Sequence, residues 1–216
     1  MNRIVLLTGF EPFDGESANP SAAIVQALDG TEVAGHRIEG ALLPVSFAAA
    51  PARLDDLLAR HDPALAVALG QAGGRAEITP ERVALNLIDA RIADNDGLRP
   101  IDIPVIDGAP FAYPTQLPVK AIVAHLRGLG IPAAPSLSAG TYVCNQVFFA
   151  LLHALSARHP HARGGFVHLP WLPEQATRHP GQPSMALEMQ TDAIRATIAC
   201  ALETDADLVV AGGTEH

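Results

Sequence analysis

Short apolar runs alternate with amphipathic segments along most of this chain. Runs of about four to eight apolar residues are typical of buried strands, whereas apolar residues spaced three and four apart indicate helices. Strands are therefore expected at residues 4–8, 38–45, 64–69, 82–90 and 165–169, with weaker candidates at 133–137 and 208–211. Helices are expected at residues 20–28, 47–60, 118–129, 144–158 and 185–202.

This alternation predicts an α/β fold, in which one domain spanning residues 1–216 holds a central twisted sheet that is mostly parallel or mixed. Helices should flank the sheet on both faces. Functional sites in such folds form at the carboxyl ends of strands. That rule selects the segments after Thr8, after Leu69, before Cys144 and around His168. The irregular stretch at residues 92–113 is typical of a lid or a binding loop.

Composition narrows the function classes. The chain has 216 residues, of which 49% are hydrophobic and 17% charged, so it can bury a sizeable core. A net charge of −9 disfavours nucleic acids and anionic membranes as partners. The N-terminus has no signal-peptide pattern, and no run approaches the ~18 apolar residues of a membrane helix. We therefore expect a cytoplasmic protein with no nucleic-acid or membrane partner.

Cys144 is the stronger of the two cysteines as a candidate for chemistry. A turn signal at residues 139–141 leads into an apolar helical segment, which places this thiol on the first turn of a helix. The unpaired N–H groups and positive dipole end found there favour the nucleophilic thiolate. Cys200 lies in the middle of an apolar helical pattern and is expected to be inert.

A cysteine nucleophile needs a base, and the base needs a group that orients it. His168 stands at the end of an apolar strand, where a catalytic side chain would project; the alternative is an ordinary core histidine. Glu81 is a candidate orienting group, although an exposed pair with Arg82 is the simpler interpretation of its position. Asp89 and Asp94 compete for the same role.

Two other chemistries have weaker signals. The glycine-rich segment at residues 70–74 could hold a phosphate in its backbone N–H groups, which leaves a phosphate- or nucleoside-binding enzyme as an alternative. Its spacing matches neither common phosphate-loop pattern. The cysteines and histidines show no metal-ligand spacing, so neither a metal nor a cofactor is expected. A non-catalytic binding module is the third possibility.

Taken together, these segments resemble the pyroglutamyl peptidase I family over nearly the full length of the chain. The resemblance includes the motifs Thr8-Gly9-Phe10-Glu11-Pro12-Phe13, Gly70-Gln71-Ala72-Gly73-Gly74-Arg75 and Val167-His168-Leu169-Pro170. The specific motifs are Glu81-Arg82-Val83-Ala84-Leu85-Asn86 and Gly140-Thr141-Tyr142-Val143-Cys144-Asn145. The resemblance implies a single α/β domain, assembly as a homotetramer, and removal of an N-terminal pyroglutamyl residue from peptides through a thioester. It implies Cys144 as nucleophile, His168 as general base and acid, and Glu81 as the residue that orients the imidazole.

Pyroglutamate is a neutral lactam without a free amine, so its site requires an apolar slot with a few hydrogen bonds and no metal. The resemblance points to Phe10, Phe13 and Gln71 as ring contacts, and to Arg91 as a second contributor to the oxyanion site beside the backbone N–H of Cys144. Ile92, Tyr142 and Val143 are candidate walls of the same slot. The simpler interpretation of the two phenylalanines is ordinary packing, and that of Arg91 is a structural ion pair.

Overall fold

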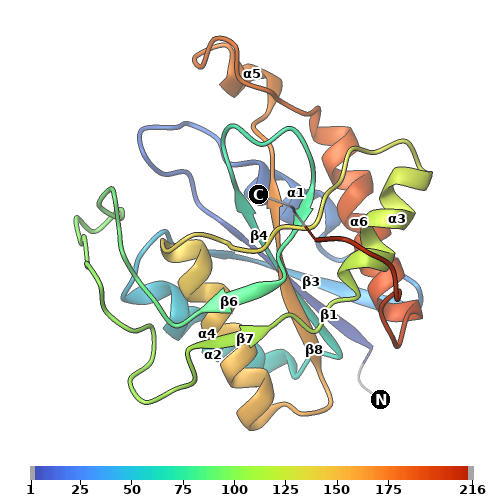
Figure 1. The fold of residues 1–216 in the computed structure, drawn as a ribbon, viewed down its shortest axis with the longest axis horizontal. Coiled ribbons are helices and arrows are strands. Elements are labelled where there is room, and N and C mark those ends of the chain that lie inside the picture. The colour runs from blue at the N-terminus through green and yellow to red at the C-terminus, as the bar shows by residue number, and fades with distance from the viewer. Residues whose placement is uncertain (1–2, 214–216) are drawn as a thin grey trace.

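A six-stranded mixed sheet organises residues 3–213, the part of the chain that the computed structural model describes. The strand order is β2-β3-β1-β4-β8-β5 (Figure 1). Its strands are β1 (Ile4–Phe10), β2 (Glu32–Val33), β3 (His36–Leu43), β4 (Leu65–Gln71), β5 (Thr79–Pro80) and β8 (Arg163–Leu169). The four central strands run parallel, and the edge strands β2 and β5 are antiparallel to their neighbours. The predicted α/β fold with a mixed sheet is therefore confirmed.

Helices cover both faces of this sheet, as predicted. The helices are α1 (Pro20–Leu28), α2 (Ala49–His61), α3 (Val119–Gly128), α4 (Val143–Arg158), α5 (Pro173–Ala176) and α6 (Leu187–Glu203). Side chains of β1 alternate between the two faces of the sheet. Val5 and Leu7 belong to the core beneath α1, α3 and α6, and Leu6 belongs to the core beneath α2 and α4. Figure 1 shows α3 and α6 side by side. None of the described helices is long and apolar enough to cross a membrane.

Three predicted strands differ from the structure. Residues 82–90 contribute only β6 (Val83–Leu85), which pairs with β7 (Ala112–Pro114) in a separate two-stranded sheet. Beyond β6 the chain bonds to the long loop instead, with the Asn86 N–H donating to the Phe111 carbonyl. Residues 133–137 form only isolated bridges, because the nearby prolines remove ladder donors. Residues 208–211 contain no strand.

Candidate active site

His168 and Glu81 form a buried pair near the carboxyl end of β8. Glu81 directly follows β5, whose Thr79 lies opposite His168 in the antiparallel register. The Nδ1 atom of His168 lies 2.7 Å from Oε1 of Glu81. The exposed fraction is 4% for His168 and 0% for Glu81. The simpler interpretation of Glu81 as an exposed partner of Arg82 is therefore wrong.

Arg75 completes the charge balance around Glu81. Its Nη1 donates to Oε1 of Glu81 over 2.7 Å and to Oγ1 of Thr79 over 2.6 Å. Burial raises the pKa of Glu81, but the His168 hydrogen bond, the Ser136 hydroxyl and the Arg75 charge together lower that pKa below its usual 4.5. Glu81 is thus a carboxylate that accepts the Nδ1–H of His168, so Nε2 carries the free lone pair.

The imidazole of His168 is neutral for a related reason. Burial lowers its pKa, the Glu81 carboxylate opposes that effect, and the Arg75 charge adds to it, so the pKa ends below its usual 6.5. The ring also packs against Phe166, with 4.8 Å between the ring centroids. A neutral ring with a free Nε2 is the state that a general base requires.

Cys144 is the second residue of α4, as the sequence predicts to within one residue. Its sulfur lies over β4, because a Cβ atom added to Gly70 would be 2.9 Å from Sγ. Gly70 is the register partner of His168 in the parallel β4–β8 pair. Alternation along the strands places Gly70 and His168 on the same face of the sheet, toward α4. The thiol and the imidazole therefore lie on the same face of the sheet, at the same level of β4 and β8.

The ionisation state of Cys144 differs from the expectation of a helix-start thiolate. Burial raises the pKa of this thiol to about 12, and the Glu81 charge adds to the effect. Arg75 and the cysteine's own backbone N–H oppose it without reversing it. The resting group is thus a neutral thiol, because burial outweighs the helix N-terminus. Nucleophilic attack requires a base to take the proton.

Asn145 fixes the start of α4, a role that sequence reasoning missed. Its Oδ1 accepts the Leu85 N–H, and its Nδ2 donates to the carbonyls of Leu85 and Leu87, all over 2.9 Å. The side chain is fully buried. These bonds tie the first turn of α4 to β6, and so they hold the backbone that carries Cys144. The available sequence signal was a pair of adjacent amides, Asn145 and Gln146, within an apolar helical segment.

The predicted pocket residues divide between two adjoining cavities. A small apolar slot beside Cys144 is lined by Phe10, Phe13, Gln71, Tyr142 and Val143, together with Asn19 and Val45. Tyr142 packs on Phe13, with 6.2 Å between the ring centroids. Arg91 and Ile92 instead line a second cavity of about 320 Å³, which shares Phe13 and Gln71 with the slot.

Asp94 holds the loop above the slot in place and is not part of the group formed by Arg75, Glu81 and His168. Its carboxylate is buried and accepts the backbone N–H groups of Phe47, Asp96 and Leu98 over 2.8 to 3.0 Å. The Tyr142 hydroxyl donates to the Ala93 carbonyl in the same loop over 2.9 Å. Burial and the Asp94 charge, with smaller contributions from Cys144 and Asp14, raise the pKa of Tyr142 to about 12, so the phenol keeps its proton.

The glycine-rich segment after β4 serves packing. A Cβ on Gly73 would lie 2.2 Å from the Trp171 ring, and the Gly70 position is filled by Cys144 and Phe166. The Ala72 N–H donates to the Leu169 carbonyl over 2.9 Å. The close contacts explain why residues 70 and 73 are glycines. The Ala72 hydrogen bond occupies one of the N–H groups that a phosphate would need.

The structure also brings together a cluster that the sequence analysis did not anticipate. Asp62, His159 and His161 offer ligand atoms that all lie within 4.8 Å of one another. The prediction of no metal site rested on the sequence spacing of the cysteines and histidines, whereas this cluster combines two histidines with an aspartate far away in the chain. The signal that could have revealed the cluster is the pair of histidines spaced two apart, directly before β8.

The chain is similar to known proteins over nearly its full length. The sequence model of the pyroglutamyl peptidase family matches residues 3–204. The chain is 53% identical to a pyrrolidone-carboxylate peptidase of Cupriavidus taiwanensis, covering 98% of this chain and 99% of that protein. It is 50% identical to the Klebsiella pneumoniae protein of the same name, covering 98% and 99%. The crystal structure of pyroglutamyl peptidase I from Bacillus amyloliquefaciens superposes with a TM-score of 0.95 at 43% identity, covering 98% of this chain and all of that one.

Proposed function

This chain belongs to the pyroglutamyl peptidase family, and we propose that it is a cysteine-type hydrolase that removes an N-terminal pyroglutamyl residue from peptides. The observation that carries the proposal is the buried Glu81–His168 pair, whose His168 lies in register with Gly70, the residue over which the sulfur of Cys144 lies. The alternative of a phosphate- or nucleoside-binding enzyme receives no support from the comparisons. The retained residues also argue against a binding module without catalysis.

Cys144 is the nucleophile in this proposal, and His168 is the base. As Sγ bonds to the pyroglutamyl carbonyl carbon, the thiol proton passes to Nε2 of His168. Glu81 accepts the Nδ1–H bond and stabilises the imidazolium that forms. General acid–base help of this kind typically contributes ~100- to 10,000-fold to the rate. Because the resting thiol is neutral, the proton transfer belongs to the attack itself.

The remaining steps complete an acyl transfer. The imidazolium gives its proton to the leaving nitrogen as the carbon–nitrogen bond breaks, which leaves a thioester on Cys144. A water molecule, deprotonated by His168, then attacks the thioester and releases pyroglutamate and the thiol. The first N–H groups of α4 have no partner within the helix, so they can stabilise the oxyanion of each tetrahedral intermediate.

The residues that line the slot beside Cys144 suit a lactam ring in their chemistry, and they must move apart to admit it, because the slot encloses only about 10 Å³. Its walls are the side chains of Phe10, Phe13, Tyr142 and Val143, which match an uncharged ring by burying its apolar surface. Gln71, at the end of β4, supplies polar groups for the ring amide. The slot offers no carboxylate pair for an ammonium group, so a substrate with a free α-amine would lose its hydration without compensation.

Arg91 and Ile92 then face the remainder of the peptide. The cavity that they line adjoins the slot through Phe13 and Gln71, and it also holds Glu16 and His179. We assign this cavity to the residue that follows pyroglutamate. Arg91→Ala should accordingly raise KM for a pyroglutamyl tripeptide more than for a small pyroglutamyl amide. An equal loss of kcat with both substrates would instead place Arg91 at the oxyanion site that the resemblance implies.

A chromogenic pyroglutamyl amide tests the activity directly. The wild-type protein should release the amine, and Cys144→Ser should lower the rate by at least about 1,000-fold, because the nucleophile is lost. Cys200→Ser is the matched control, since Cys200 is buried in α6 and should leave turnover unchanged. The corresponding prolyl amide should not be cleaved. Full activity of Cys144→Ser would overturn the assignment.

Assembly and location follow from the family resemblance. We infer a homotetramer in the cytoplasm, with exposed apolar side chains of the long loop as the contact surface. Ile101 is 60% exposed and Phe111 is 72% exposed. Light scattering should give four times the 22.6 kDa chain mass, whereas a monomeric mass would refute the tetramer. Fractionation of cells should recover the protein with cytoplasmic markers.

A further inference from the structure

A second cluster of ionisable side chains lies just before the starts of β4 and β8, away from Cys144. Asp62 follows α2 and precedes β4, and His159 and His161 lie between α4 and β8. These two connections enter neighbouring parallel strands, with Leu65 opposite Arg163 in register. The catalytic pair lies near the other ends of the same strands. The two sites are therefore separated by the length of β4 and β8.

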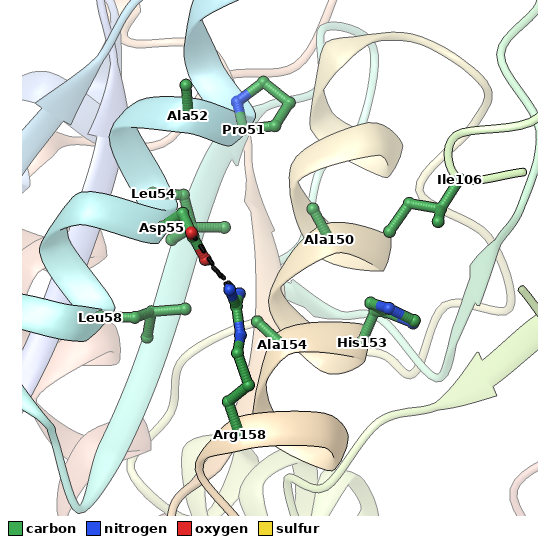
Figure 2. A pocket seen from close by; sticks show the side chains of 10 residues that line it. All are labelled: Pro51, Ala52, Leu54, Asp55, Leu58, Ile106, Ala150, His153, Ala154 and Arg158. Atoms are coloured by element: carbon green, nitrogen blue, oxygen red, sulfur yellow. Dashed lines mark hydrogen bonds and ion pairs between the residues drawn. The ribbon is translucent and has the colours of Figure 1, made fainter.

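The backbone around this cluster is held in place. The Asp62 N–H donates to the Leu58 carbonyl, and the His159 N–H donates to the Leu155 carbonyl, so each residue caps its helix. The Arg163 N–H donates to the Ala64 carbonyl over 3.1 Å and joins the two connections. Figure 2 shows Arg158 of α4 reaching Asp55 of α2 across a cavity of about 270 Å³, in an ion pair just before His159.

The ligand atoms have the spacing of a metal site. Nδ1 of His159 lies 3.0 Å from Oδ1 of Asp62, and Nε2 of His161 lies 3.2 Å from the same oxygen. Ligands about 2.0–2.1 Å from a tetrahedral zinc ion stand about 3.3 Å apart. Both separations are therefore close to the required value before any ion binds.

Charge and exposure favour a cation at this position. The carboxyl ends of α2 and α4 both point at the cluster, and a helix C-terminus carries partial negative charge. Asp62 adds a carboxylate, while the nearby Arg158 is already paired with Asp55. The His161 side chain is 50% exposed, so an ion can enter from solvent. The His159 side chain is only 13% exposed, which restricts its motion.

We propose that Asp62, His159 and His161 form a binding site for a zinc-class divalent cation, an inference that goes beyond the proposed peptidase activity. Two imidazoles and one carboxylate are a donor set that zinc binds well and that magnesium and calcium do not. The cation takes the place of the imidazole N–H protons that face Asp62. It thereby links the two segments that lead into β4 and β8. Its role is structural, because Cys144 lies at the other ends of these strands.

The test measures Zn²⁺ binding to chelator-stripped protein by calorimetry, in a Cys144→Ser background so that the catalytic thiol contributes no ligand. The parent should bind one Zn²⁺ at this site and should not bind Mg²⁺. His161→Gln should weaken Zn²⁺ binding by more than the ~10–100-fold lost with an outer-shell partner, because it removes a ligand. His125→Gln, at an exposed histidine of α3, is the matched control and should bind like the parent.

Two outcomes would overturn the proposal. One is equal Zn²⁺ affinity in the parent and in His161→Gln; the other is a parent that binds no Zn²⁺ once Cys144 is replaced. Thermal unfolding gives a second readout, since Zn²⁺ should raise the midpoint of the parent and of His125→Gln but not of His161→Gln. The His161→Gln change in a chain with Cys144 intact should keep full peptidase activity, which separates this proposal from the proposed function.

Discussion

At the scale of single residues, the candidate site depends on how burial distributes charge among three side chains. Glu81 stays ionised because Arg75 and His168 compensate its burial, whereas His168 and Cys144 stay neutral. Sequence reasoning singled out Cys144, His168 and Glu81, but it favoured an exposed Glu81 and a thiolate at Cys144. Both differences arise from burial, which depends on contacts between residues distant in the chain, such as that between Glu81 and His168.

Replacing Glu81 by Gln tests the role of its charge. The variant can still accept a hydrogen bond from Nδ1 of His168, but it no longer stabilises the imidazolium and it leaves Arg75 without its buried partner. We expect kcat for a pyroglutamyl amide to fall by about 100- to 10,000-fold. KM should change little, because Glu81 does not line the slot. Glu77→Gln, at a partly exposed glutamate nearby, is the control; an active Glu81→Gln enzyme would refute the role.

The ionisation of Cys144 can be followed by thiolate absorbance in the ultraviolet. With a pKa raised to about 12 by burial, the thiol should contribute no thiolate band at neutral pH. The difference spectrum between wild type and Cys144→Ser should develop the band only in strongly alkaline solution. A band present at neutral pH and lost on acidification would instead indicate a preformed thiolate–imidazolium pair.

At the scale of elements, the long strands and helices were predictable because each carries a complete apolar period. The short elements were not: β2, β5, β7 and α5 contain two to four residues each, and tertiary pairing determines them. Residues 82–90 show the same limit, since their alternation continued past Leu85 but hydrogen bonds to the long loop ended the strand. The aromatic residues of the slot were predictable from the sequence. The position of Arg91 and Ile92 in a second cavity was not, because it depends on the loop that Asp94 holds by hydrogen bonds.

Gly70 shows how tightly β4 and α4 approach each other. An added Cβ would lie 2.7 Å from the Phe166 ring and 2.9 Å from the Cys144 sulfur, so Gly70→Ala must displace one of them. We expect a loss of about 1–3 kcal/mol in stability and up to about 100-fold in kcat. Chemical denaturation and turnover of a pyroglutamyl amide measure the two effects.

Gly128→Ala provides the matched control for that change. Gly128 is the last residue of α3, and a Cβ there would meet nothing within 4 Å. The substitution should leave activity unchanged and stability equal or slightly higher. If Gly70→Ala behaved like Gly128→Ala, the close approach of Cys144 to β4 would be refuted.

In the molecule as a whole, the two ends of the parallel strands have different roles. The carboxyl ends of β4 and β8 hold the groups for acyl transfer, and the opposite ends hold the Asp62–His159–His161 cluster. The α/β class and this placement of the chemistry followed from strand–helix alternation alone. The second cluster did not, because it requires the ends of α2 and α4 to meet in space.

Acid should destabilise the entire fold through the buried pair. The pKa of His168 lies below its unfolded value of 6.5 and that of Glu81 below 4.5. Each group therefore contributes stability that is fully present above its unfolded pKa and is lost as pH falls toward its folded pKa. The free energy of unfolding should decrease as pH falls below 6.5. His168→Gln should reduce that slope by up to about 1.4 kcal/mol per pH unit; an unchanged slope would contradict the lowered pKa of His168.

Acyl transfer to Cys144 is measured most directly by the mass of the protein quenched in acid during turnover of a pyroglutamyl ester. Acid preserves a thioester by removing the base that activates water. A thioester intermediate on Cys144 predicts a mass increase of one pyroglutamyl group, located on the peptide that contains Cys144 and absent in Cys144→Ser. An active enzyme that carries no such adduct, or that carries it on another residue, would contradict the account.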